Sequence, residues 1–443
     1  MTPSKLLATV LACTLLCTLP AEAGADLDAR VKAPPKDAEG LLDLGRALRR
    51  AGKFDQAVRI LRRAYFKAAR GPLAIQVRLE AARSLIDAGQ QKQALRECAS
   101  LKAVSPEYQW VCTAEAHLLW KRASLALPLV EQALEKDAAN YDALVAKGHA
   151  LSQMGKKAEA EAQYRKAIRS DAKRFEAYLR LGKLLGGKPG LVQLEKAKQV
   201  APDEPAPLLA LGTALDAGSA AQAALEKAIA LRPGFGAAHA RLGVVKHRLG
   251  DVAGADAALR RAIATDAKKA DWHAALAAVL VDKKDAKAAL AEAELAIKLV
   301  SNHAGAKLAR ANALAQLGEI DLAIEAYEQA HGFARTDPEP LVQAARACLA
   351  HSRPTTARAF ADRVTQDFAD YAPGWVALGE VQRAAGERAA AIENAPIGRW
   401  RDRGAGDAFD ARDRDGGDVR VEGVAARGSA ARGAGGSRSG WPG

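Results

Sequence analysis

The residues whose spacing most resembles a known chemical site run from Gly182 to Lys188 and read GKLLGGK. They match GxxxxGK, a loop in which backbone N–H groups and a lysine hold phosphates. In that loop a serine or threonine follows the lysine and binds magnesium, but here Pro189 takes its place. No strand pattern precedes the segment, although the loop requires one. We therefore do not predict nucleotide binding.

Patterns for metal or nucleophilic chemistry are missing as well. The eight histidines stand at positions 117, 149, 239, 247, 273, 303, 331 and 351. None belongs to an HExxH motif or to a histidine and cysteine spacing suited to zinc. A GxSxG nucleophile elbow is also absent from the sequence. The sequence therefore predicts no enzymatic activity and no metal or organic cofactor.

Basic and amide side chains recur at spacings that suit a binding surface instead. The candidate residues of a peptide-binding groove are Arg46, Arg49, Arg83, His149, Arg180, Lys183, Asn312 and Arg346. Because arginine holds a carboxylate through two parallel hydrogen bonds, such a groove would favour an extended acidic segment or a C-terminal carboxylate. The competing interpretation is solvated charge on an exposed helix face.

The elements that must position these residues repeat every 34 residues. Two segments show the period directly: 141–174 reads YDALVAKGHALSQMGKKAEAEAQYRKAIRSDAKR, and 236–269 reads GAAHARLGVVKHRLGDVAGADAALRRAIATDAKK. Both have glycine at positions 8 and 15 and alanine at positions 20 and 27 of the unit. A period of this length predicts stacked helix-turn-helix units.

Small residues fill the same columns along the chain. The predicted repeat-packing residues are Gly45, Gly148, Gly182, Gly212, Gly243 and Gly379 at position 8, and Ala57, Ala160, Ala255 and Ala323 at position 20. Two antiparallel helices approach closely only where the side chains at their crossing are small. Gly155, at position 15, is predicted to form the turn between the two helices of its unit.

This pattern of small residues resembles the signature of the tetratricopeptide repeat family and covers residues 38–394, with the last repeat incomplete. The resemblance implies an all-α fold, a right-handed superhelical solenoid of about eleven helix-turn-helix repeats. It also implies that the first helix of each unit lines an inner face that binds other proteins. The candidate groove residues do not reproduce the lysine and asparagine arrangement of the two-carboxylate clamp found in chaperone adaptors of the family.

Two units depart from the period. They are shortened around GGKPG at 186–190 and DAGSA at 216–220, where the turn between helices should lie. We predict that the second helix loses about one turn in each. The result would be either a local change in superhelical curvature, which we favour, or a specialised binding kink.

Cys98 and Cys112 fall in the second helix of one unit and the first helix of the next. They could pair in an oxidising compartment, but we favour buried free thiols because Cys98 occupies an apolar column. Cys348 also stands at a packing position and has no evident partner.

The N-terminal residues 1–23 resemble a secretory signal, with Lys5, an apolar run from Leu6 to Leu19, and an A-x-A end at Ala21 to Ala23. Residues 24–37 would be a linker. No later stretch approaches the ~20 apolar residues that span a bilayer, so we predict an exported protein of the periplasm or extracellular space without a transmembrane anchor. Lipidation at Cys13 or Cys17 is a less favoured alternative.

The sequence is strongly basic, with a formal net charge of +13 over 443 residues. Such a charge attracts nucleic acid, anionic membranes or acidic proteins. Export makes nucleic acid an unfavoured partner, so other proteins with extended or acidic segments are the predicted partners.

The repeat pattern stops in mid-helix after Ile392. Residues 395–443 are rich in arginine, glycine and aspartate, a composition typical of disorder. They form either an Arg/Gly-rich arm for acidic surfaces or, as we favour, the product of a frameshifted reading.

These observations favour an exported scaffold that helps to assemble a bacterial envelope complex of the secretion, pilus or outer-membrane biogenesis type. The bacterial source is an expectation from the signal and the composition. Two alternatives stay open: a substrate-binding arm of an enzyme whose catalytic part lies beyond Asn394, and a polysaccharide-export helper.

Overall fold

The computed structural model describes residues 27–68, 71–392 and 394, and all regular secondary structure within them is helical. The predicted signal at 1–23 and the predicted tail at 395–443 lie outside the described residues. The stretch predicted as a linker, 24–37, contains a helical segment at 27–32. Leu27 of this segment packs on the first helix pair, and Asp28 forms an ion pair with Lys53.

The helices form consecutive antiparallel pairs, which we number as repeats. Repeats 1 to 5 are α2 (Ala38–Arg50) with α3 (Phe54–Lys67), α4 (Pro72–Asp87) with α5 (Gln91–Ala99), α6 (Pro106–Leu119) with α7 (Ala123–Lys136), α8 (Tyr141–Gln153) with α9 (Lys157–Ser170), and α10 (Glu176–Leu185) with α11 (Gly187–Val200). A short 3-10 helix, η1 (Ser100–Ala103), follows α5.

Repeats 6 to 10 continue the pattern, and α22 begins an eleventh. They are α12 (Pro205–Ala214) with α13 (Ser219–Leu231), α14 (Gly236–Arg248) with α15 (Val252–Thr265), α16 (Ala270–Asp282) with α17 (Ala286–Leu299), α18 (Ala304–Gln316) with α19 (Ile320–Phe333), α20 (Glu339–Ala350) with α21 (Pro354–Asp367), and then α22 (Ala372–Ala384). The all-α solenoid of paired helices predicted from the period is confirmed.

Glycine supplies the turn within several repeats. Gly155 has φ of +78° between α8 and α9, and Gly250 has φ of +81° between α14 and α15. This left-handed conformation is open to glycine and strained for most other residues. The predicted role of Gly155 is therefore confirmed.

The small columns lie where the two helices of a repeat cross. A Cβ atom built on Gly148 would stand 2.6 Å from the Tyr164 ring, and one on Gly243 would stand 2.6 Å from the Leu259 side chain. The position-20 residues Ala57, Ala160, Ala255 and Ala323 are fully buried. At Gly379 the nearest atom is the Ala391 carbonyl oxygen at 3.7 Å, so this last crossing is looser. At Gly148 and Gly243, a large side chain of the second helix therefore packs directly against the glycine of the first helix.

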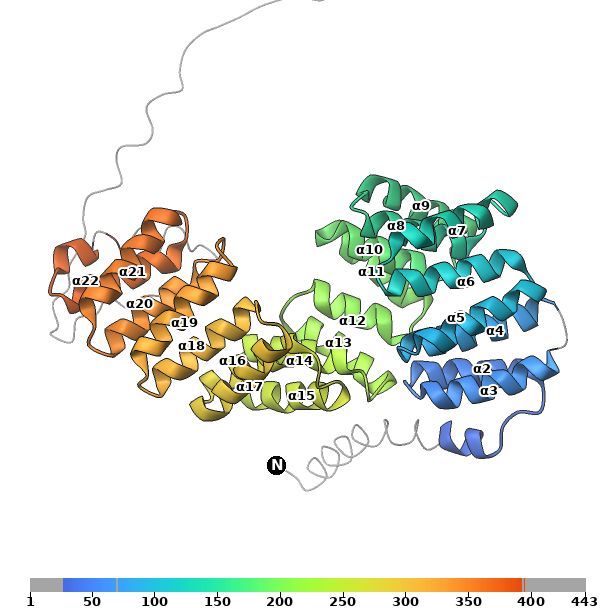
Figure 1. Ribbon diagram of the computed structural model, residues 1–443, viewed down its shortest axis with the longest axis horizontal. Coiled ribbons are helices and arrows are strands. Elements are labelled where there is room, and N and C mark those ends of the chain that lie inside the picture. The colour runs from blue at the N-terminus through green and yellow to red at the C-terminus, as the bar shows by residue number, and fades with distance from the viewer. Residues whose placement is uncertain (1–26, 69–70, 393, 395–443) are drawn as a thin grey trace, which may run out of the picture.

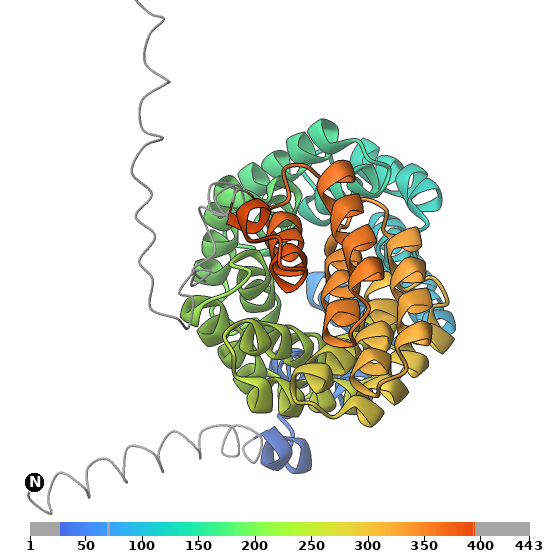
Figure 2. The same cartoon turned by 90° about the vertical axis from the view of Figure 1, so that its left-hand side faces the viewer.

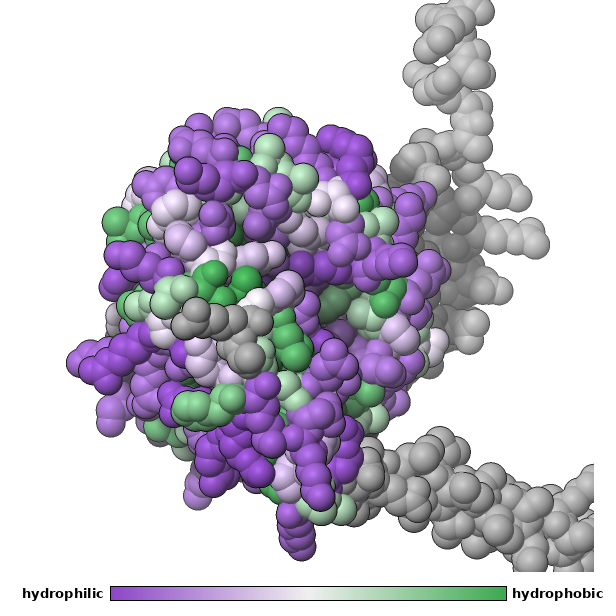
Figure 3. Space-filling model, turned by 90° about the vertical axis from the view of Figure 1, so that its right-hand side faces the viewer, coloured by the Kyte–Doolittle hydropathy of each residue, from purple (hydrophilic) through white to green (hydrophobic). Residues whose placement is uncertain are grey.

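The stacked pairs curve into a superhelix (Figure 1), which appears as a closed ring when seen along its axis (Figure 2). Every two consecutive first helices, such as α2 and α4 or α8 and α10, contact each other. Over the described residues, no two consecutive second helices, such as α3 and α5, contact each other as closely as the first helices do. Because the inner layer of a curved stack is the compressed one, the first helices form the inner wall. Hydrophilic side chains cover most of the outer surface at the N-terminal end (Figure 3).

The two shortened repeats differ from the prediction, because the first helix is the short one. In repeat 5, α10 has 10 residues whereas α11 has 14; in repeat 6, α12 has 10 and α13 has 13. The segment GKPG, which we assigned to a turn, forms the first turn of α11. Proline is tolerated there because a first-turn N–H has no intrahelical acceptor.

Candidate functional site

Several candidate groove residues of the inner wall are joined by ion pairs in repeats 1 to 4. Arg49 on α2 lies across from α4, where its Nε is 2.8 Å from the Asp87 carboxylate and its Nη1 is 3.1 Å from Glu80. Glu80 in turn lies 3.6 Å from Arg83 on the same helix. The charge of Arg49 is therefore met by carboxylates of the next first helix.

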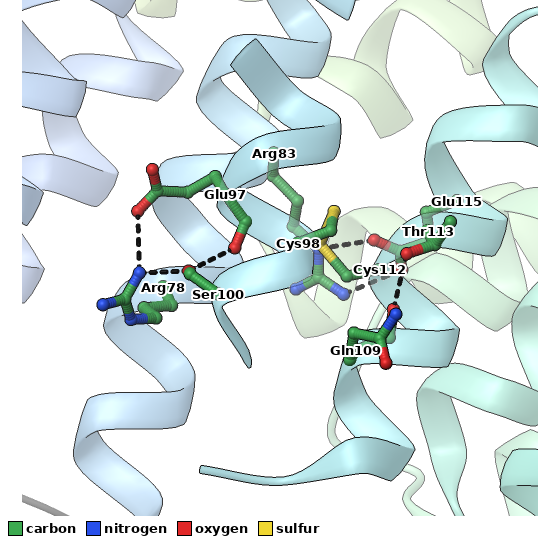
Figure 4. The surroundings of a disulfide bond; sticks show 9 residues. All are labelled: Arg78, Arg83, Glu97, Cys98, Ser100, Gln109, Cys112, Thr113 and Glu115. Atoms are coloured by element: carbon green, nitrogen blue, oxygen red, sulfur yellow. Dashed lines mark hydrogen bonds and ion pairs between the residues drawn. A yellow bond between two sulfur atoms is a disulfide. The ribbon is translucent and has the colours of Figure 1, made fainter. Parts of the chain in front are cut away.

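Arg83 extends this series toward repeat 4. It donates two hydrogen bonds to Glu115 on α6, of 3.2 and 2.9 Å, and a third of 2.9 Å to Asp142 on α8 (Figure 4 shows the Glu115 pair). Asp142 also accepts from Arg174, at 2.7 and 3.0 Å. We call this set the ion-pair ladder: Arg49, Glu80, Arg83, Asp87, Glu115, Asp142 and Arg174.

Glu80 and Asp142 are the buried acids of the ladder, whereas its arginines are half-buried and Asp87 is exposed. Burial alone would raise the pKa of Asp142, but the ion pairs with Arg83 and Arg174 outweigh it and lower the pKa to about 2. The pKa of Glu80 is lowered in the same way by Arg49 and Arg83. Arg49 and Arg83 are thus committed to carboxylates of their own chain, and we no longer assign them to guest contact.

Three other candidate residues meet in a single pocket between repeats 4 and 5. The pocket has a volume of 350 Å³ and lies among α8, α9 and α10. We call it the cationic pocket, and it is lined by His149, Ser152, Lys157, Tyr164, Arg180, Lys183 and Leu184. No carboxylate lines it, and Arg180 and Lys183 have no ion-pair partner in the described part of the chain. At this pocket the inner wall therefore presents unpaired positive charge.

The titration of the lining residues reflects that charge. Burial, together with the nearby charges of Arg180 and Lys183, lowers the pKa of His149 to about 3. Partial desolvation on the concave wall, together with Arg180, also lowers the pKa of Lys183. His149 is consequently neutral near pH 7. An anion entering the pocket would relieve this repulsion.

A tyrosine hydroxyl adds a further donor to the pocket. Tyr164 and Tyr327 occupy the same position of repeats 4 and 9, on the second helix facing the position-8 residue. In repeat 9 the Tyr327 hydroxyl donates to Asn312 at 2.6 Å, which ties up this candidate groove residue. The Tyr164 hydroxyl has no such bond to any described residue and lines the pocket. It remains available to a bound group.

The remaining candidates lie far along the wall from this pocket. Arg46 donates to Gln76 at 3.3 Å and lies 3.7 Å from Asp43. Arg346 pairs with Glu380 at 3.1 Å near the C-terminal end of the solenoid. Of the eight candidates, the structure therefore brings His149, Arg180 and Lys183 together in one pocket, while Arg49 and Arg83 share Glu80 in the ion-pair ladder.

Cys98 and Cys112 form a disulfide, which corrects the preference for free thiols (Figure 4). The bond joins α5 to α6 with the two Cα atoms 5.4 Å apart. The prediction failed because α5 ends early, at Ala99, and η1 then turns the chain directly into α6. This places the two apolar columns side by side. Cys348 is buried and free.

Sequence reasoning missed Ser152, Lys157 and Tyr164 as pocket residues. Tyr164 stands at a repeat position that is leucine in repeats 1 and 7, at Leu61 and Leu259. Its hydroxyl could have been recognised as a polar group next to the position-9 side chain. Lys157 begins a second helix, and the repeat register alone does not direct it toward the inner wall.

Two searches of the described residues complete the picture of the site. None of the helices in 27–68, 71–392 and 394 combines the length and the apolar character needed to cross a bilayer. Over the same ranges, no three histidine, cysteine, aspartate or glutamate side chains cluster in a way that could hold a metal ion.

Comparison with known sequences identifies the repeat. Family models of the tetratricopeptide repeat match residues 41–73, 141–174 and 304–335. The second of these matches carries His149, Lys157 and Tyr164 of the cationic pocket. No curated protein matches the chain.

Solved structures share the architecture at low sequence identity. The crystal structure of the APC/C hetero-tetramer Cut9-Hcn1 is 15% identical with a TM-score of 0.54, covering 82% of this chain and 80% of that one. Yeast Tom70 is 14% identical with a TM-score of 0.38, covering 88% and 96%. The human IFIT1 dimer with PPP-AAAA is 15% identical with a TM-score of 0.41, covering 74% and 90%. The first of these supports the fold.

Proposed function

Because the chain is a tetratricopeptide repeat protein, we propose that it is an exported scaffold that binds extended, acidic segments of other proteins on its inner wall. In this role it brings together the members of an envelope complex and performs no chemical step of its own. The cationic pocket is where the guest segment is anchored.

The observation that carries the proposal is the pair of unpartnered cations, Arg180 and Lys183, on one turn of α10. A carboxylate of a guest would supply the counter-charge that the chain itself supplies to Arg83. The guanidinium of Arg180 can hold both carboxylate oxygens, while Lys183 acts as a second point charge. The free Tyr164 hydroxyl can donate to the same group.

The choice of an extended guest rests on the shape of the wall. Consecutive first helices lie side by side from α2 to α22, so a continuous concave surface runs past the pocket on both sides. An extended segment can touch several repeats at once, and each contact adds to one anchored carboxylate. Electrostatic anchoring should make the binding weaken as salt rises.

The compartment is proposed on separate grounds. A buried disulfide between α5 and α6 suits an oxidising environment such as the periplasm or extracellular space. The predicted signal at 1–23 points to the same route. Assembly of an envelope complex is the role that we propose for a basic scaffold with one anchoring pocket in that setting.

The proposal is tested by charge reversal at the pocket. The full chain carrying Arg180→Glu and Lys183→Glu, and the wild type, are used as bait in envelope fractions, with captured proteins identified by mass spectrometry. We expect a specific set of proteins to be lost from the variant. Acidic peptides from those proteins should then bind the wild type in calorimetry, and bind the variant at least tenfold more weakly.

A matched control has the same change in net charge in the same region. Lys166→Glu and Arg169→Glu alter exposed residues of α9 that do not line the pocket. This variant should capture the same proteins as the wild type. Equal loss of capture in both variants, or no loss in either, would contradict the pocket as the anchor.

A further inference from the structure

One set of contacts joins parts of the solenoid that are distant in sequence. Arg232 lies directly after α13, and its side chain reaches the end of α2 in repeat 1, where α2 and α13 approach in Figure 1. Its Nε donates to the Arg50 carbonyl oxygen and its Nη2 to the Arg49 carbonyl oxygen at 3.3 Å. Partners 182 and 183 residues apart are unusual in a stack where each repeat contacts its neighbours.

Both ends of repeat 6 take part in this contact. Glu204, at the start of α12, lies 2.8 Å from the Nε atom of Arg50. At the other end of the repeat, the Arg232 guanidinium stands 4.8 Å from the centre of the Phe235 ring and 5.9 Å from that of Phe54. Repeat 6 is therefore attached to repeat 1 at two points.

The chemistry of the Arg232 contact suits a helix end. The last carbonyl groups of α2 have no intrahelical donor, and the end of the helix carries partial negative charge. A guanidinium satisfies both needs, because it brings several N–H donors and a positive charge. The turn after α2 comes close enough for this, since a Cβ on Gly52 would lie 3.6 Å from the Arg232 side chain.

We propose that Arg232 is a latch that closes the first superhelical turn by holding repeat 6 against repeat 1. With the latch closed, the curvature of the inner wall across repeats 2 to 5 is fixed. With the latch open, this stretch can extend like an ordinary solenoid. The latch thereby sets the shape of the wall that contains the cationic pocket.

The ion pair of Arg50 with Glu204 contributes differently from Arg232. Burial raises the pKa of Glu204, and the attraction of Arg50 and Arg49 does not fully offset it. A carboxyl whose pKa is higher in the closed form binds protons more readily there, so this group favours closure more as pH falls. Closure therefore depends more on the two hydrogen bonds from Arg232 to the α2 carbonyl oxygens than on the charge of Glu204. The charged groups that face the contact are Arg49, Arg50, Glu80, Asp87, Glu204 and Arg232.

The latch is tested by measuring the distance between repeats 1 and 6 in the full chain. Spin labels are attached through Arg59→Cys on α3 and Lys227→Cys on α13, both exposed positions, and distances are measured by double electron–electron resonance. We expect one narrow distribution in the otherwise unchanged chain. Arg232→Ala should shift the distribution to longer distances and broaden it, whereas Glu204→Gln should leave it narrow.

Two controls separate opening from unfolding. Arg165→Ala removes an ion pair with Glu161 within α9 and should leave the distances unchanged. Circular dichroism of Arg232→Ala should keep the helical signal of the wild type. An unchanged distance distribution in Arg232→Ala, or equal opening in Glu204→Gln, would overturn the assignment of Arg232 as the latch.

Discussion

Two neighbouring stretches of the inner wall carry basic side chains, among them Arg83 and Lys183 at the same repeat position, but use them differently. In repeats 1 to 4, Arg49 and Arg83 meet acids on the following first helix. In repeat 5, Arg180 and Lys183 line the cationic pocket with His149 and Tyr164 of repeat 4, and no carboxylate lines that pocket. Whether a basic residue is structural or free for a guest is thus decided by whether a neighbouring repeat places a carboxylate beside it.

The largest difference between the two stretches should appear in stability. Asp142→Ala leaves Arg83 and Arg174 without their shared buried carboxylate, which should lower the free energy of unfolding by about 3 to 5 kcal/mol. Guanidinium denaturation followed by circular dichroism measures the loss. A change below 1 kcal/mol would show that the ladder does not hold these repeats together.

The same carboxylate predicts how stability depends on pH. Its pKa, lowered to about 2 in the folded chain, lies below the unfolded value. A lowered pKa gives stability that is present above the unfolded pKa and is lost as pH falls toward the folded one. The wild type should therefore lose stability between about pH 4 and pH 2, and Asp142→Asn should lose less over that interval.

The disulfide stiffens the ladder stretch and has no counterpart in the described pocket stretch. Reduction opens a bond across a sequence separation of 14 residues, for which the loop-closure model gives about 3 kcal/mol. We expect dithiothreitol to lower the melting temperature and to reduce amide protection in α5 and α6. Protection in α8 to α10 should change little, and equal loss in both regions would argue against a local effect.

Packing at a position-8 glycine should give an intermediate effect. Gly148→Leu must displace the Tyr164 ring, since even a Cβ would come within 2.6 Å of it, and overpacking of this kind costs about 1 to 3 kcal/mol. Gly379→Ala is the matched control because its nearest atom is 3.7 Å away. Thermal unfolding of the two variants compares them, and equal destabilisation would contradict the assigned crossing.

The smallest effect on stability belongs to the pocket cations. Lys183→Ala removes an exposed charge with no ion-pair partner in the described residues, so the free energy of unfolding should change by no more than about 0.5 kcal/mol. Denaturation under the conditions used for Asp142→Ala checks this. A loss comparable with that variant would mean that Lys183 is structural.

The sequence predicted the repeat fold well. It did not predict which basic side chains form ion pairs within the chain and which stay free for a guest. The fold followed from Gly148, Gly243 and their equivalents, because a close helix crossing tolerates little else at such positions. The predicted groove mixed two kinds of residue, because Arg83 and Lys183 share a repeat position. Their difference arises from Glu115 and Asp142 on later helices, contacts that a one-repeat pattern does not encode.

Other features depended on local geometry that the period leaves open. The disulfide required the early end of α5, and the short first helix of repeat 5 required GKPG to start α11. The contact of Arg232 with α2 depends on the pitch of the whole turn, to which every repeat between 1 and 6 contributes. Small angles at each junction add up over that distance, so no local sequence pattern predicts it.

The most direct test of the account is the titration of His149 by NMR, with and without an oligoglutamate peptide as the guest probe. In the free protein, burial and the charges of Arg180 and Lys183 hold the pKa of His149 at about 3. A carboxylate seated in the cationic pocket would offset those charges, so we predict that saturating peptide raises this pKa. Binding of the peptide with no change in the His149 titration would contradict the pocket as the anchoring site.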